Sequence, residues 1–235
     1  MKHHYQDLFP HLLDHSQYNR RSRALVCELE ELRWAFNNLI GIKQNYCIID
    51  TTPVVAVGMT RDKVHSDFAG IASYGYCASK RLFYYGFKLV MLCNLEGLPL
   101  HIELIPANTD ERTAADEILD RLPCGSIIIG GKGFIGKDWQ STWLERGISL
   151  LAFTRKNQHE QIHHKLWRRL RGLRTRIEGT YKLLKENGRS IEHTLAHTVE
   201  GLCLRVLTKI TSLAARLFLR NAFGIDVLTF KQQIN

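Results

Sequence analysis

The chain has 235 residues, of which 45% are hydrophobic and 23% are charged. This balance excludes a disordered or fibrous protein and predicts one globular domain with helical ends. No apolar run reaches the roughly 18 to 20 residues that span a bilayer, and the first residues, MKHHYQDLFPHLL, lack the apolar core of a signal peptide, so we expect a cytoplasmic protein. The 32 Lys and Arg residues exceed the 23 acids, and the formal net charge of +9 is compatible with a polyanionic partner.

Residues 1–40 are predicted to be helical, because apolar residues recur at three- and four-residue intervals through SRALVCELEELRWAFNNLI and Gly41 follows as a stop. The pattern then changes to short apolar runs. YCIID (46–50) and PVVAVGM (53–59) are typical of two strands, interrupted by Thr51, Thr52 and Pro53. Residues 83–94 and 96–108 form a predicted antiparallel hairpin across a glycine-containing turn.

Helices and strands alternate in the next part of the chain. Asp110 is placed to cap the helix ERTAADEILDRL, and a buried strand follows in GSIIIGG (125–131). A helix at 137–146, a strand in ISLLAFT (148–154) and two long helices at 165–186 and 191–222 complete the prediction. This order predicts an α/β fold with a mixed sheet flanked by helices.

Cysteine and histidine patterns do not support a structural metal site. The six cysteines stand singly with no CxxC pair, so we predict buried free thiols. Tandem histidines occur at 3/4 and 163/164, and His193 and His197 have the i, i+4 spacing that could hold a metal. Because no HExxH pattern accompanies that pair, a helix-surface or core role is the preferred interpretation.

Asp50 is the strongest candidate for a functional residue in the first half of the chain. It directly follows an apolar strand, so its carboxylate can reach into a cleft while its backbone is fixed. A turn-capping role is the alternative.

The helix at 165–186 carries the second candidate, Glu178. An apolar stripe is predicted to face the sheet, and Glu178 lies on a neighbouring cationic face. That face also contains Arg171, Arg174, Thr175, Lys182 and Lys185. Glu178 either forms an i, i+4 ion pair worth about 0.2 to 0.5 kcal/mol or binds a divalent cation while the bases contact phosphates. Gly172 and Gly179 in the same helix suggest close approach of another group to its backbone.

Two carboxylates at these places are suited to metal-ion phosphoryl transfer, in which two Mg²⁺ ions activate the attacking oxygen and stabilise the leaving one. Such ions require several carboxylate oxygens. A third acid would come from a strand beside Asp50, and SIIIGGKGFIG (126–136) is the best candidate strand.

Taken in order, several motifs make the chain resemble bacterial insertion-sequence transposases of the DDE type, whose catalytic domain has a ribonuclease H-like fold. They are YNRR, IIDTTPV, the long stretch from ASKRLFYYGF to IPANTDE, IIGGKGFIG, RTRIEGTYKLLKE and EHTLAHTVEGLCLRVLTKI. The resemblance implies a helical segment at 1–42, shorter than in relatives, a ribonuclease H-like domain at 43–190 and a helical segment at 191–235. It also implies a cytoplasmic, nucleoid-associated protein that forms homo-oligomers on DNA.

The resemblance implies that Asp50 and Glu178 are the first and last catalytic acids and bind two Mg²⁺ ions, for which Mn²⁺ can substitute. The enzyme would hydrolyse a DNA phosphodiester and then join the freed 3′-hydroxyl to target DNA. Lys132, Arg171, Arg174 and Lys182 are the expected DNA contacts. Trp139, Trp143 and Trp167 are expected to be packing anchors rather than stacking platforms for bases.

The second catalytic aspartate of such transposases falls at Gly131, within Gly131-Lys132-Gly133-Phe134. Losing a metal-bridging carboxylate should lower the rate roughly a thousandfold or more, so we expect very little strand cutting. Asp110 and Asp138 are the possible substitutes, although Asp110 fits a helix cap and Asp138 lies in the next helix. Two alternatives stay open: an inactive DNA-binding remnant that interferes with full-length transposase, and a nuclease that cuts without joining strands.

Overall fold

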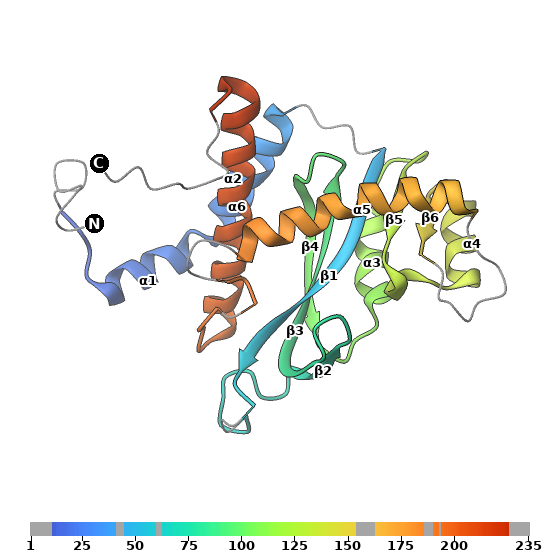
Figure 1. Cartoon of the computed structure of the whole chain (residues 1–235). Coiled ribbons are helices and arrows are strands. Elements are labelled where there is room, and N and C mark those ends of the chain that lie inside the picture. Colours follow the sequence, from blue (N-terminus) through green and yellow to red (C-terminus); the bar gives the residue numbers. More distant parts are fainter. Residues whose placement is uncertain are drawn as a thin grey trace.

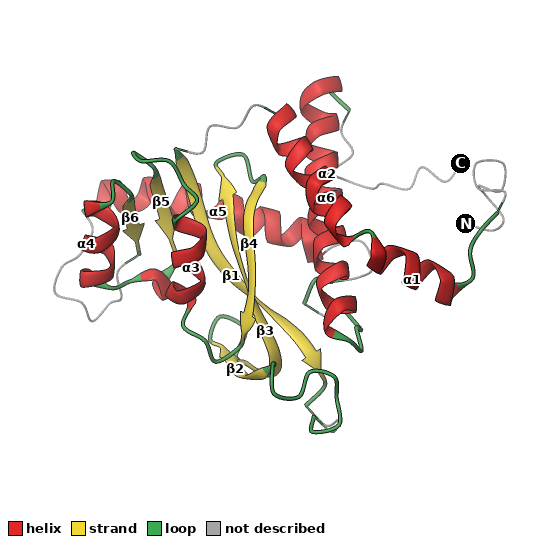
Figure 2. Ribbon diagram, turned by 180° about the vertical axis from the view of Figure 1, so that it is seen from behind, coloured by secondary structure: helices red, strands yellow, loops and turns green. Residues whose placement is uncertain are grey.

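The computed structural model describes residues 11–40, 45–59, 63–153, 163–185, 190–192 and 194–225. A twisted mixed sheet occupies the centre, and helices lie on both of its faces (Figures 1 and 2). The elements are α1 (His15–Ala24), α2 (Val26–Leu39), β1 (Tyr46–Val57), β2 (Ser73–Cys77), β3 (Leu82–Asn94), β4 (Pro99–Pro106), α3 (Glu111–Leu119), β5 (Ile127–Gly130), the short 3₁₀ helix η1 (Lys132–Phe134), α4 (Lys137–Glu145), β6 (Ser149–Ala152), α5 (His164–Lys185) and α6 (Val199–Phe223). The prediction of an α/β fold with a mixed sheet is confirmed.

The sheet has the order β2-β3-β1-β5-β6, and β4 also pairs with β3. β3 is antiparallel to β1, β2 and β4, whereas β5 and β6 continue parallel to β1. The predicted hairpin of residues 83–94 and 96–108 is confirmed as β3 and β4. β1 therefore lies in the middle of the sheet, between an antiparallel and a parallel neighbour.

Alternating side chains of the central strands supply two hydrophobic cores, one on each face. Ile48 and Met91 pack on the face covered by α5 and α6. Ile49 and Leu92 pack on the opposite face, which α3 and α4 cover. Figure 1 shows α5 crossing the first face, and Figure 2 shows α3 and α4 over the second. A side chain at position 50 therefore points to the α5 face.

Three local features differ from the prediction. Residues 46–57 form one continuous strand rather than two. Pro53 is tolerated because its missing N–H falls on the side of β1 that faces away from β3. Val55, two residues further on, directs its N–H to that same side, where it donates to the carbonyl of Glu192 rather than to β3. Strand β2 was not predicted, because its SYGYC sequence has no buried aliphatic residues. Leu166, predicted to belong to the apolar stripe of α5, is 45% exposed.

The second long helix begins at Val199 rather than at 191, because Thr198 caps it by accepting a hydrogen bond from the backbone N–H of Gly201. Helix α6 packs against α2. Among the described residues, no helix is long and apolar enough to cross a membrane.

The cysteine prediction is confirmed only in part. None of the six cysteines forms a disulfide, but only Cys47 and Cys93 are buried, and Cys27, Cys124 and Cys203 are exposed. His193, the tandem pair at 3/4 and the side chain of His164 lie outside the described residues.

Gly172 and Gly179 do not mark a close contact within the described chain, because a Cβ added at either position meets no atom within 4 Å. We expect Gly172→Ala and Gly179→Ala each to raise the free energy of unfolding by about 0.5 to 1 kcal/mol, since alanine loses less backbone entropy in a helix. Urea unfolding with an unchanged m-value would measure the gain. Gly97→Ala is the contrast: Gly97 has φ +86° and its added Cβ would lie 2.6 Å from Thr180 Oγ1, so it should destabilise the protein.

Candidate active site

Asp50 lies within β1, rather than after a strand as predicted, and Gly131 lies beside it where β5 ends. β1 and β5 are parallel, and Ile49 lies opposite Gly130. The residues that follow these two, Asp50 in β1 and Gly131 just after β5, are therefore neighbours. Gly131 is buried and has φ −69° and ψ −178°, a conformation that any residue adopts. A Cβ at this position would lie 3.1 Å from Asp50 Oδ1. A side chain at 131 would therefore point at the Asp50 carboxylate.

Helix α5 brings Glu178 and Arg174 to the same place. Arg174 donates from Nη2 to Asp50 Oδ2 at 3.0 Å, and the same Nη2 lies 3.8 Å from Glu178 Oε1. Asp50 is mostly buried, with 15% of its side chain exposed, whereas Glu178 is 56% exposed. Both predicted acids are thus present at one site, and one guanidinium lies near both.

Tyr181 fixes α5 against the strand that carries Asp50. Its hydroxyl donates to the backbone carbonyl of Asp50 at 2.7 Å. The side chain is 4% exposed, and burial, with Asp50 adding to it, raises the pKa of Tyr181 well above its ordinary value. Tyr181 lies one helical turn beyond Glu178 on the same helix, so this bond helps to set the position of Glu178 relative to Asp50.

Asp50 and Glu178 line one cleft of about 470 Å³. Its charged lining also includes Glu111, Lys80, Lys88, Arg174 and Lys185. The cleft therefore carries more positive than negative side chains.

Glu111 is a cleft residue that sequence reasoning missed. Burial raises the pKa of Glu111, while Lys88, whose Nζ lies 3.7 Å from Glu111 Oε1, opposes that rise. Its carboxylate occupies the space beside Gly133, where an added Cβ would lie 1.9 Å from Oε2. In the sequence, Glu111 resembles an ordinary first-turn acid next to the cap Asp110, and no local signal indicates that it reaches the cleft.

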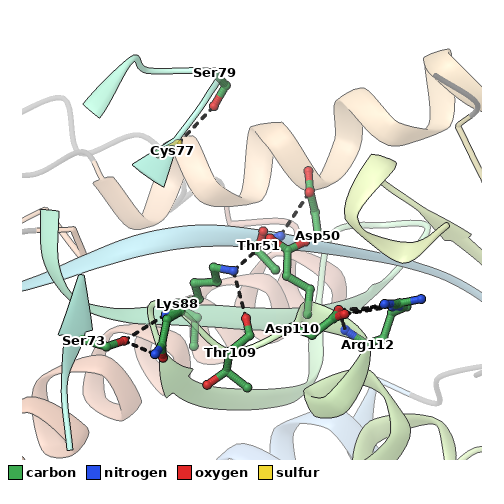
Figure 3. Close-up of polar contacts among 12 residues, drawn as sticks. Asp50, Thr51, Ser73, Cys77, Ser79, Lys88, Thr109, Asp110 and Arg112 are labelled. Atoms are coloured by element: carbon green, nitrogen blue, oxygen red, sulfur yellow. Dashed lines mark hydrogen bonds and ion pairs between the residues drawn. The ribbon is translucent and has the colours of Figure 1, made fainter. Parts of the chain in front are cut away.

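Asp110 and Asp138 do not line this cleft. Asp110 caps α3 through the backbone N–H of Arg112, as predicted, and also pairs with the Arg112 guanidinium. Figure 3 shows Asp110 joined to Arg112, while the side chain of Asp50 is directed at the α5 ribbon. Asp138 lies in the first turn of α4 and is exposed.

The other predicted DNA contacts lie on η1 and α5 and do not line the cleft. Lys132 and Lys182 are exposed, and the guanidinium of Arg171, also exposed, lies 5.2 Å from the ring centre of Trp167. Trp139 and Trp143 are packing anchors, as expected, because both ring N–H groups donate to Asp116 Oδ1. Trp167 packs edge-on against Phe153.

Within the described ranges, no three His, Cys, Asp or Glu side chains come together in a way that could hold a metal ion. Asp50 and Glu178 are instead linked through Arg174.

Residues 40–199, more than half of the chain, match the family described as "Transposase DDE domain". The chain belongs to the DDE transposases. This membership bears out the resemblance to DDE transposases.

Two known structures were found to be similar to this DDE transposase. A piggyBac transposase synaptic complex with hairpin DNA has a TM-score of 0.46 at 9% identity, covering 76% of this chain and 50% of that one. A pre-cleavage Mos1 transpososome has a TM-score of 0.29 at 13% identity, covering 90% and 64%. The chain thus spans less than two thirds of either chain. No curated protein matches the sequence.

The Tyr181 contact can be tested directly. We expect Tyr181→Phe to lower the free energy of unfolding by about 1 to 2 kcal/mol, because the carbonyl of Asp50 loses its donor in a buried setting. Urea unfolding measures the change. Tyr18→Phe is the matched control: Tyr18 is 60% exposed on α1, so its loss should change stability by less than about 0.5 kcal/mol. Equal stability of the two variants would contradict a structural role for the Tyr181 hydroxyl.

Proposed function

We propose that this DDE transposase acts on the DNA of an insertion sequence through a catalytic centre formed by Asp50, Glu178 and position 131. Glycine at position 131 leaves this copy with very little cutting or strand-transfer activity. The reaction class is metal-dependent phosphodiester hydrolysis followed by strand transfer.

One observation carries the proposal: a Cβ at position 131 would lie 3.1 Å from Asp50 Oδ1, and 3.9 Å from Arg174 Nη2. An aspartate there would direct a second carboxylate at the point that Asp50 and Arg174 already share. Nothing in the local backbone requires glycine, since φ is negative. Position 131 therefore has the geometry of a catalytic acid position without the acid.

Family membership supports the use of a divalent cation, and Mg²⁺ is the ion we expect. As the chain stands, its donors do not fit a two-ion site. Three carboxylates line the cleft, but Glu178 is mostly exposed and Glu111 lies 3.7 Å from Lys88, and within the described chain they do not come together as a metal-ligand group. Such ions, when bound, would polarise a phosphodiester and activate water. Asp50, Glu178 and an aspartate restored at 131 would hold them.

Basic residues on η1 and α5 support binding of DNA. Lys132, Arg171 and Lys182 are exposed and carry charges suited to backbone phosphates. Arg174 is less accessible, with 32% of its side chain exposed, and its guanidinium donates to Asp50. We therefore assign phosphate contact first to the three exposed residues and only secondarily to Arg174.

A second function, that of an inactive DNA-binding protein that interferes with full-length transposase, is favoured by the Arg174 ion pair. The guanidinium neutralises Asp50 at 3.0 Å without a metal ion. A site whose acid already has an internal cation needs no bound metal to be stable. The chain can then retain its DNA surface without the chemistry.

The experiment that tests both functions measures nicking, strand transfer and DNA binding by the whole chain. Labelled DNA carrying the ends of the element is incubated with Mg²⁺ or Mn²⁺, and binding is followed against salt concentration. We expect salt-dependent binding, weakened by Lys132→Ala, Arg171→Ala and Lys182→Ala, with almost no nicking. Nicking by the unmodified chain that disappears in Asp50→Asn would show that another group completes the site and would contradict the role of Gly131.

A further inference from the structure

Strands β2 and β3 carry a cluster of aromatic side chains on one face of their hairpin. Tyr74 and Tyr76 alternate along β2, and their partners across the sheet are Tyr85 and Phe83. Tyr74 and Tyr85 lie with ring centres 5.0 Å apart, and Tyr76 and Phe83 with ring centres 4.5 Å apart. Cross-strand aromatic pairs of this kind stabilise a hairpin and hold their rings in fixed positions.

The outer part of this cluster faces solvent. Tyr85 is buried, and its hydroxyl donates to the carbonyl of Phe68. Tyr76 and Phe83, by contrast, are 51% and 68% exposed, and Tyr74 is 59% exposed. We name Tyr76 and Phe83 the exposed aromatic pair. Packing within the chain buries the inner ring, Tyr85, but leaves the exposed aromatic pair accessible to solvent.

The exposed aromatic pair lies between two cavities. Tyr76 lines the cleft that contains Asp50 and Glu178. Phe83 lines a second cavity, of about 920 Å³, together with His65 and His197. The pair is therefore continuous with the candidate active site and forms part of the path into it.

Basic residues lie near this hairpin and in the adjoining cleft. Lys63 lies with its Nζ 6.0 Å from the ring centre of Tyr74. Arg81 is exposed at the tip of the hairpin, where its backbone has φ +50°. Lys88 and Lys185 line the cleft that Tyr76 also lines. Flat rings beside cations are suited to a single nucleic acid strand, whose bases stack while its phosphates meet the cations.

We propose that Tyr76 and Phe83 form a stacking platform for unpaired bases of a DNA strand that enters the Asp50–Glu178 cleft. The identity of the ligand as DNA rests on the proposed function. The platform accepts any base, because every base has a π-face and neither ring supplies a set of hydrogen-bonding groups that would select one. The nearby positive charge favours this polyanion over a protein partner with a neutral apolar face.

The test compares two labelled DNA molecules that share one sequence, a fully paired duplex and the same duplex with a run of unpaired thymines, by fluorescence anisotropy in EDTA. The whole chain is expected to bind the molecule with unpaired bases more tightly. Tyr76→Ala combined with Phe83→Ala should weaken that binding about tenfold or more and leave binding of the paired duplex unchanged. Tyr76→Phe should behave as the original chain, because the ring is kept.

Tyr18→Ala is the matched control, since Tyr18 is equally exposed but lies on α1, and it should change neither affinity. Circular dichroism verifies that each variant is folded. The platform is ruled out if the double variant keeps the preference for unpaired bases, or if the original chain binds both DNA molecules equally. It is also ruled out if the double variant changes only self-association in sedimentation, which would assign the pair to contacts between copies. Failure to bind even the paired duplex would overturn the proposed function as well.

Discussion

Gly131→Asp is expected to raise metal-dependent nicking of element-end DNA by roughly a thousandfold or more over the unmodified chain. The new carboxylate would extend from a Cβ 3.1 Å from Asp50 Oδ1, so Asp50 must shift by a few tenths of an ångström to admit it. A shared divalent cation compensates the repulsion between the two acids, and several kcal/mol of transition-state stabilisation correspond to this change in rate. Gel assays of nicking and strand transfer, in Mg²⁺ and separately in Mn²⁺, measure it.

Metal binding supplies a second readout for the same variant. Without a cation, two carboxylates this close should repel, so Gly131→Asp is expected to melt at a lower temperature than the unmodified chain in EDTA. Saturating Mg²⁺ should raise its melting temperature more than that of the unmodified chain, because only a folded site with three acids binds the ion well.

Two variants act as controls for Gly131→Asp. Gly131→Asn has nearly the same size but no charge and should remain inactive. Gly131→Asp combined with Glu178→Gln should lose the regained activity and most of the metal-dependent stabilisation. A Gly131→Asp chain that binds Mg²⁺ but does not cut would leave the metal site intact and contradict the proposed transposase activity. Equal activity of the Asp and Asn variants would refute the proposed role of position 131.

Local sequence patterns predicted the fold well where one side of an element is buried. The β3–β4 hairpin, the cap at Asp110 and helix α5 are where their apolar periodicity and turn residues indicated. β1 was predicted as two strands because a proline ordinarily interrupts a ladder, and only the pairing of its neighbours shows that the missing N–H falls on an open edge. Which side of a strand is paired depends on the whole sheet, and a local sequence pattern does not contain this information.

In the candidate site, too, local patterns predicted some residues, whereas others are brought there by the packing of distant segments. Asp50 and Glu178 could be predicted to meet because one directly follows a buried apolar run and the other lies on a helix with an apolar stripe for the sheet. The position of Gly131 beside Asp50 depends on the parallel register of β1 and β5. Glu111 and Tyr76 could not be predicted, because Glu111 follows a helix cap and Tyr76 lies in a strand of weak pattern. Their places in the cleft result from packing between distant segments.

Lowering the pH from about 6.5 to about 4 is expected to remove up to roughly 3 kcal/mol of stability through one residue, His101. His101 is 4% exposed on β4, and neither ring nitrogen has a hydrogen-bond partner within the described chain. Its ring packs edge-on against the ring of Trp34, with the two ring centres 5.1 Å apart. Burial, followed by the charges of Arg121 and Arg33, lowers the pKa of His101 from 6.5 to about 4, while Glu30 opposes them.

The direction of this effect follows from which state binds the proton. Between pH 6.5 and 4 the unfolded chain protonates this histidine and the folded chain does not, so protons favour unfolding. The contribution is complete above pH 6.5 and is lost progressively below it. Glu30 adds a separate loss at lower pH, because hydrogen bonding from Arg33 lowers the pKa of Glu30 although its burial opposes this. The clearest window for His101 is therefore pH 6.5 to 4.5.

Urea unfolding of the original chain and His101→Phe across this window isolates the histidine. Phenylalanine keeps a ring against Trp34 but binds no proton, so His101→Phe should lose much less stability than the original chain between pH 6.5 and 4.5. His197→Phe removes an exposed histidine and should keep the original pH dependence. Parallel pH profiles for the original chain and His101→Phe would mean that His101 is already protonated in the folded protein, with Glu30 as its counter-charge. The buried edge of β4 would then tolerate an imidazolium, contrary to the expectation from its missing hydrogen-bond partners.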